Sequence, residues 1–279
     1  MGRYIKADID RGLKVKWYIF AAITLLSAVR ILLFDISINN RLINLSMSNQ
    51  LSVVDNFFYM FRGMKEYIST GRDAFEISDA YLIMNIILAI LIGIYPVKDS
   101  KGVGRLYMVK GKNRSLWWLS KCVWNVFTVV FFYISIYVGI LAGTIIYELI
   151  SHADVWHYTL NIDMVRLICN YSVEGTDTHK LLLYIIFMPV AASIVLSYIQ
   201  MLISFLAGQI TGYIIVIIAA CMSAYYMSPF AIGNGMMALR YVLLNPDGVK
   251  MSHVILISIV ISFFVIFVGN IYFKKKDII

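Results

Sequence analysis

Residues 181–227 form an uninterrupted run without a single Asp, Glu, Lys, Arg or His. A soluble domain needs a polar surface, so an uncharged run of this length indicates segments that lie in a lipid bilayer. The composition agrees, because 61% of the 279 residues are hydrophobic, 14% are charged and the mean hydropathy is +0.79. We predict an all-α membrane protein, since a helix in lipid satisfies its own backbone hydrogen bonds.

Six apolar segments are candidates for transmembrane helices, for which about 20 residues are needed. They lie at about residues 17–34, 80–97, 122–147, 181–206, 212–227 and 254–273. The fourth and fifth belong to the uncharged run, and the sequence AGQITG between them contains two glycines. This sequence predicts a tight turn rather than one helix that is too long for a bilayer.

The distribution of Lys and Arg predicts that both termini are cytoplasmic. In this N-in/C-in orientation the cytoplasmic segments contain fifteen Lys and Arg residues and the outer loops eight. The outer loops, at residues 35–79, 148–180 and 228–253, also contain twelve of the sixteen acidic residues. Cytoplasmic loops are enriched in Lys and Arg, so we expect a multi-pass protein of the cell membrane in this orientation.

Residues 1–16 precede the first span and have an amphipathic pattern. Met1, Ile5, Ile9 and Leu13 recur every four residues, and charged residues occupy the rest of the helical wheel. The pattern predicts a helix that lies under the lipid headgroups. The alternative is a disordered basic tail.

The cytoplasmic segment 98–121 contains seven basic residues and one acid between two apolar spans. We predict a short helix in which Val103, Leu106 and Tyr107 share one face and Arg105 points away. A short helix with an apolar edge and basic flanks suits docking into a cleft on a soluble partner. The alternative is a basic surface that faces anionic lipid.

Motifs for chemistry are missing from the sequence. It contains no H-E-x-x-H, no G-x-S-x-G and no G-x-x-x-x-G-K-[ST], so we expect no catalytic, cofactor-binding or metal site in this chain. The predicted spans contain no carboxylate or histidine, which disfavours an ion-coupled carrier. Arg30, in the first span, is expected to snorkel outward or to pair with Asp35.

The fourth span contains a stripe of polar residues on one helical face. These residues are Ser193, Ser197, Gln200 and Ser204. Such a stripe can line a substrate pathway or join helices by hydrogen bonds, and both alternatives stay open. In the third span, Gly139 and Gly143 form a small-xxx-small pair that predicts close helix packing.

The first outer loop contains the apolar sequence SVVDNFFYMFRGMKEYI. Its apolar residues recur at helical spacing and predict a helix that lies on the outer surface. These residues are Val54, Phe57, Phe58, Phe61 and Met64.

Three sequence patches carry a family resemblance. The cytoplasmic segment SKGVGRLYMVKGKNRSLWWLSK resembles the E-x-x-x-G-T-x-x-x-L-x-x-x-x-x-S-R-x-x-x-x-x-S-K pattern of ABC-2 type permeases, the membrane subunits of ABC transporters. The C-terminal GNIYFKKKDII is similar to their closing G-x-x-x-F-x-x-[KR]-D-[IL], and SPFAIGNGMMALR to their outer P-x-N-x-x-x-x-x-R segment. The six-span layout agrees with this family over the whole chain.

The resemblance implies roles for both cytoplasmic segments. Residues 1–16 would be the connecting helix, and the loop 98–121 would contain the coupling helix that contacts an ABC ATPase subunit. Gly102, Leu106, Arg114 and Lys121 match the glycine, apolar, arginine and lysine positions of the motif. The departures are Val103 for threonine, Asn113 where serine is common and Asp99 for the leading glutamate. The expected ATPase-coupling residues are Gly102, Val103, Arg105, Leu106, Tyr107 and Arg114.

The expected function is therefore the permease subunit of an ATP-driven exporter. ATP and Mg²⁺ would bind a separate ATPase subunit, and a second copy or a similar permease would complete the pathway. The long outer loops and aromatic-rich spans favour an amphiphilic substrate such as a peptide or drug, and we expect no nucleic-acid partner. Two alternatives are a membrane immunity or sensor protein that binds a peptide at its outer loops, and a secondary carrier.

Overall fold

The computed structural model describes residues 1–47, 50–68, 75–110, 113–169 and 175–275. Apart from loops, turns, short 3₁₀ and π segments and one isolated β-bridge, the described residues are α-helical, which confirms the all-α prediction. The α-helices are α1 (Gly2–Asp8), α2 (Trp17–Asn44), α3 (Val53–Phe61), α4 (Asp79–Lys101), α5 (Val103–Lys110), α6 (Arg114–Ser151), α7 (Ile162–Cys169), α8 (Thr178–Leu206), α9 (Gln209–Tyr225) and α10 (Met251–Lys275).

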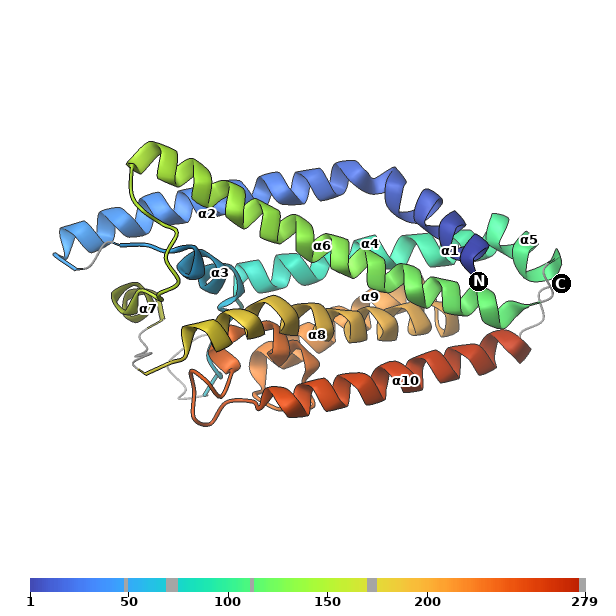
Figure 1. The fold of residues 1–279 in the computed structure, drawn as a ribbon. Helices are drawn as coiled ribbons and strands as arrows, with labels where there is room; N and C mark the ends of the chain where they lie inside the picture. Colours follow the sequence, from blue (N-terminus) through green and yellow to red (C-terminus); the bar gives the residue numbers. More distant parts are fainter. Residues whose placement is uncertain (48–49, 69–74, 111–112, 170–174, 276–279) are drawn as a thin grey trace.

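The long helices run along one axis and form a bundle (Figure 1). α2 packs along α6, and α8 packs against α4, α6, α9 and α10. α1, α5 and the start of α6 lie at one end of the bundle, which we call the α5 end. α3, α7 and the end of α2 lie at the opposite end, the α7 end (Figure 1).

Within the described residues, five helical segments are long and apolar enough to cross a membrane. They are Gly2–Asn44, which includes both α1 and α2, and the helices α4, α6, α8 and α10. α9 corresponds to the fifth predicted span but is shorter, at 17 residues. The helices therefore support a membrane protein, whereas the count of six spans and the N-in/C-in orientation stay predictions.

The N-terminal segment is helical, as the amphipathic pattern predicts. α1 continues through a π-helical turn at Ile9–Leu13 and a 3₁₀ turn at Lys14–Lys16 directly into α2. Gly12 is buried against Tyr95 and the indole of Trp124, where a Cβ atom would overlap both rings. The segment is thus packed on the bundle and is not a disordered tail.

α2 continues to Asn44, well beyond the predicted end of the first span at residue 34. Asp35 was expected to mark the outer loop, but its side chain is fully buried and accepts a hydrogen bond of 3.0 Å from Asn56 Nδ2. The same Asn56 nitrogen also donates to Thr144 Oγ1 on α6, at 2.9 Å. The segment predicted as the first outer loop therefore begins with a helical extension that is joined to both α3 and α6.

α3 forms where the first outer loop predicts a helix, but its expected position on the outer surface is wrong. Val54, Phe57, Phe58 and Phe61 are all at most 7% exposed. Their burial occurs because α3 packs against α2, α4, α6 and α8 at the α7 end. A capping box between Ser52 and Asp55 starts the helix, with each side chain hydrogen-bonded to the other's backbone N–H.

Two predictions about glycine agree with the structure. A Cβ at Gly139 would lie 2.5 Å from the carbonyl oxygen of Thr24, and one at Gly143 would lie 2.6 Å from that of Ala28. These glycines let α6 approach the backbone of α2 closely. Gly208, with a φ of +102°, forms the tight turn between α8 and α9, where a side chain would be strained.

Candidate functional site

The predicted coupling segment forms α5 and presents apolar side chains to solvent. Val103 is 49% exposed, Leu106 58% and Tyr107 42%. The opposite face of α5 packs on the bundle through Gly104 and Met108, which are buried. Gly102 lies between α4 and α5, so the end of α4 sets the direction of α5. The structure thus places Gly102, Val103, Leu106 and Tyr107 together on one exposed edge.

The two arginines among the expected coupling residues, Arg105 and Arg114, lie on two different helices, α5 and α6. Arg105 is exposed on α5, and Arg114 is the half-buried first residue of α6. Residues 111 and 112, between the two arginines, lie outside the described residues. Asn113 caps α6 by accepting a hydrogen bond of 3.1 Å from the Leu116 N–H, a role that serine can also fill.

Beneath α5 lies a buried cluster of charged side chains, which we call the Lys121 cluster. Lys121 is fully buried and forms ion pairs with Asp8 of α1 and, at 2.6 Å, with Asp99 of α4. Arg11 Nη1 reaches the other oxygen of Asp99, at 3.1 Å. Tyr95 donates a hydrogen bond of 2.7 Å to Asp8. Two acids and two bases therefore compensate one another in a water-poor position.

The Lys121 cluster joins three helices at the point where α5 is attached. A Cβ at Gly104 would overlap the Asp99 carboxylate, so the start of α5 lies directly on the cluster. Tyr107 of α5 packs edge-on against Tyr4 of α1, with ring centroids 5.7 Å apart, and lies 5.5 Å from the Arg11 guanidinium carbon. The helix that carries the exposed edge therefore packs directly on the Lys121 cluster, in which acidic and basic side chains are paired.

Sequence reasoning missed this cluster. The motif comparison identified Lys121 as a matched position and Asp99 as a departure from the leading glutamate, and it gave neither residue a partner. The one available signal was that Asp99 is the single acid in the basic segment 98–121. No comparable signal identified Asp8, which is far from both partners in the sequence.

The polar stripe of α8 is buried and points toward other helices. Ser193 shares a hydrogen bond of 2.7 Å with the Tyr133 hydroxyl, and Ser197 donates one of 2.6 Å to Asn125 Oδ1. Gln200 donates to the Ala89 carbonyl of α4, at 2.8 Å. These contacts agree with the alternative in which the stripe joins helices.

Ser204 continues the stripe at the α5 end of α8. It is 4% exposed, and its hydroxyl oxygen has no hydrogen-bond partner within the described part of the chain. It faces Gly212 of α9, where a Cβ would overlap the hydroxyl. The four residues of the stripe, Ser193, Ser197, Gln200 and Ser204, therefore lie where α8 contacts α6, α4 and α9.

Sequence analysis gave an ion pair with Asp35 as one expectation for Arg30, but the structure does not show this pair. Arg30 instead forms a bidentate ion pair with Asp79 at the start of α4, with N–O distances of 2.8 and 2.9 Å. The reason is the direction of the side chains: Asp35 turns inward to Asn56, whereas Arg30 faces the first turn of α4. Its guanidinium carbon also lies 5.3 Å from the ring centroid of Tyr59.

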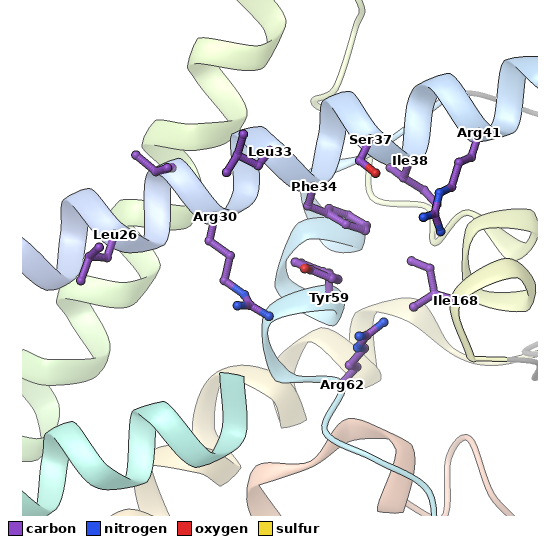
Figure 2. Close-up of a pocket in the computed structure, with 11 residues that line it drawn as sticks. Leu26, Arg30, Leu33, Phe34, Ser37, Ile38, Arg41, Tyr59, Arg62 and Ile168 are labelled. Carbon is purple, nitrogen blue, oxygen red and sulfur yellow. The ribbon is translucent and has the colours of Figure 1, made fainter. Parts of the chain in front are cut away.

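Arg30 lines a pocket of about 550 Å³ between α2 and α3 at the α7 end. In Figure 2, Arg41 lies to the right of the Phe34 ring and Arg62 lies below the Tyr59 ring, and these two rings are stacked on each other. The ring centroids of Phe34 and Tyr59 are 3.6 Å apart. The guanidinium carbon of Arg62 lies 5.1 Å from the ring centroid of Tyr59. Sequence analysis did not predict this basic, aromatic pocket, because its residues come from three separate segments: α2, the end of α3 with Arg62, and α7.

The segment SPFAIGNGMMALR, predicted to lie on the outer side, forms a compact, buried loop between α9 and α10. The Arg240 guanidinium is fully buried and donates to the carbonyl oxygens of Met64, Lys65 and Ala224 at 2.6–2.9 Å. It also donates to Asn234 Oδ1 at 3.3 Å, so the asparagine and the arginine of the motif are in contact. This loop closes the α7 end of the bundle rather than forming an open binding surface.

The C-terminal motif packs near the α5 end. Gly269 allows close contact with the indole of Trp118, and Phe273 is stacked on that indole at 5.3 Å. Residues 276–279 of the motif lie outside the described residues. The part that is described anchors the end of α10 beside the start of α6.

Comparison with known proteins adds no assignment: no family model, curated protein or solved structure matches the chain. The class defined by fold and composition is an all-α membrane protein with two distinctive sites. One is the exposed edge of α5 above the Lys121 cluster, and the other is the arginine-lined pocket at the α7 end.

Proposed function

We propose that the chain is the permease subunit of an ATP-driven ABC-2 type exporter. The observation that carries this proposal is the exposed apolar edge of α5, made of Val103, Leu106 and Tyr107 and held on the Lys121 cluster. An apolar edge in contact with water is unfavourable unless a partner covers it. A rigid attachment is what a coupling element needs, because movement of the partner must reach the transmembrane helices.

The remaining parts of the proposal follow from the resemblance and the charge distribution. The partner would be an ABC ATPase subunit that binds ATP and Mg²⁺, with the α5 end in the cytoplasm and six spans in the cell membrane. A second permease copy would complete a pathway for an amphiphilic peptide or drug. The stripe of α8 is the candidate for its polar wall, on condition that the helices separate during transport, because its hydrogen bonds now join α8 to α6 and α4.

Leu106→Asp tests the proposal. If α5 fills a cleft on the ATPase, the substitution buries an unpaired carboxylate at a cost of several kcal/mol. The affinity-tagged chain should then lose its ATP-binding cassette subunit and the associated ATPase activity during purification from native membranes. Insertion into the membrane should be unchanged, because the side chain is exposed in the isolated chain.

Two control variants separate docking from folding. Leu106→Met keeps an apolar side chain of similar volume and should retain the ATPase subunit. Leu45→Asp introduces the same charge at a 53% exposed position near the end of α2 and should retain it as well. If Leu106→Asp keeps the subunit and its activity, α5 is not the coupling element. If the wild-type chain yields no such subunit, the non-transporting alternative gains support.

A further inference from the structure

A second pocket adjoins the arginine-lined one. It has a volume of about 230 Å³, and both pockets are lined by Leu26 and Arg30. Its other lining residues are almost all apolar and come mainly from α2, α4 and α6. The two pockets are neighbours along α2, and we call them together the Arg30 groove.

The Arg30 groove changes from basic to apolar along the axis of α2. Its basic half extends from Arg30 to Arg41, toward the α7 end. Its apolar half extends along α2 from Arg30 back to Ile23, toward the middle of the bundle. On α4 this half is lined by Ala80, Ile83 and Ile87, which lie in the first turns of the helix. At 1.5 Å per residue, the stretch of α2 from Ile23 to Arg41 is about 27 Å long, which matches an amphiphile with a charged head and an extended tail.

The charges in the basic half favour an anion. Asp79 compensates Arg30. Neither Arg41 nor Arg62 forms an ion pair within the described part of the chain. Arg41 is exposed and Arg62 is half-buried, and both extend toward the space beside Tyr59 (Figure 2). Two guanidinium groups on either side of a cavity bind phosphate oxygens well, because each offers several donors in one plane.

The apolar half favours a hydrocarbon chain. Ile83 lies on a candidate membrane-spanning helix, lines the apolar half and is 51% exposed. The start of α4 at Asp79 places Arg30 where a polar loop enters an apolar helix. That level is where the headgroups of a bilayer would meet its hydrocarbon core.

We propose that the Arg30 groove binds an anionic phospholipid. Arg41 and Arg62 contact its phosphodiester, and one acyl chain lies between α2 and α4 against Ile83 and Ile87. The site is independent of α5, and it requires only that the bundle is embedded in a bilayer. It therefore goes beyond the transport proposal and does not depend on it.

The test uses the full chain in a neutral detergent and native mass spectrometry of bound lipid. Phosphatidylglycerol and phosphatidylcholine with identical acyl chains are titrated in parallel, each with and without inorganic phosphate. The head variant is Arg41→Gln with Arg62→Gln, and its control is Lys180→Gln, an exposed cation at the start of α8.

The tail variant is Ile83→Trp, which fills the apolar half from an exposed position. Its control is Ile214→Trp on α9, where the native side chain is equally exposed, at 51%. Each position tolerates a larger side chain without repacking the core, so both variants should fold like the wild type.

Phosphatidylglycerol should bind at least tenfold more tightly than phosphatidylcholine. The head variant should lose about tenfold in affinity, since it removes charge-assisted hydrogen bonds. Ile83→Trp should weaken binding severalfold, both controls should match the wild type, and millimolar phosphate should not compete.

Three results would overturn the proposal. Equal binding of the two lipids would show that headgroup charge is not recognised. Full competition by phosphate together with no effect of Ile83→Trp would identify a site for a free anion. Unchanged binding in the head variant would place the bound lipid elsewhere on the bundle.

Discussion

Lys121→Met is the substitution that most directly tests how the α5 end is held together. Methionine has a similar length, so the change removes the charge with little change in volume. Asp99 keeps Arg11 and a hydrogen bond of 3.3 Å from the Trp117 indole. Asp8 keeps only the Tyr95 hydroxyl, and its second oxygen already has no hydrogen-bond partner among the described residues.

The loss of stability should be large because Asp8 remains as a buried charge without a cation. Removal of one partner from a buried ion pair typically costs about 3–5 kcal/mol. We expect a decrease of this size in the free energy of unfolding, measured by denaturant titration in mixed micelles. The variant with both Asp8→Asn and Lys121→Met should recover at least half of the loss, since it removes the uncompensated carboxylate.

Lys14→Met is the matched control. Lys14 forms an ion pair of 2.7 Å with Asp10 in the same N-terminal segment, but both side chains are largely in contact with water. Exposed pairs contribute little, so this variant should be close to the wild type. The reasoning would be refuted if Lys121→Met were no more destabilising than Lys14→Met, or if adding Asp8→Asn made the protein less stable still.

Two further predictions concern pH and topology. Burial raises the pKa of the Asp55 carboxyl to about 7, against the opposing effect of hydrogen bonds from the backbone N–H groups of Asn161 and Ser52. The folded state therefore binds this proton more tightly than the unfolded chain, and Asp55 should lower the free energy of unfolding as pH rises from about 4 to 7, by up to about 1.4 kcal/mol per pH unit. Asp55→Asn should remove this contribution from a pH series of denaturant titrations, and an unchanged slope would contradict it. For topology, single cysteines at Ser115 and Thr176, without the native three, should react with an impermeant maleimide from the cytoplasmic and outer sides respectively; reaction of both from one side would rule out the six-span arrangement.

Local patterns were sufficient for much of the secondary structure. The turn at Gly208, the helices of residues 1–16 and the short helix α5 all follow from spacing and residue type over a few residues. The helix of the first predicted span continues past residue 34, where Asp35 was expected to begin a loop in water. Asp35 is buried instead because Asn56, from another helix, donates a hydrogen bond to it.

The sequence by itself determined that the chain is an all-α membrane protein, because hydrophobicity and charge show which segments leave water. Only the tertiary structure decided which charges meet: Asp8 and Asp99 with Lys121, and Arg30 with Asp79 rather than Asp35. The same holds for α3, which is amphipathic in sequence but buried by four neighbouring helices. The physical reason is that hydropathy is a property of each segment, whereas a buried charge is tolerated only beside a partner, and helix packing determines which partner lies within reach.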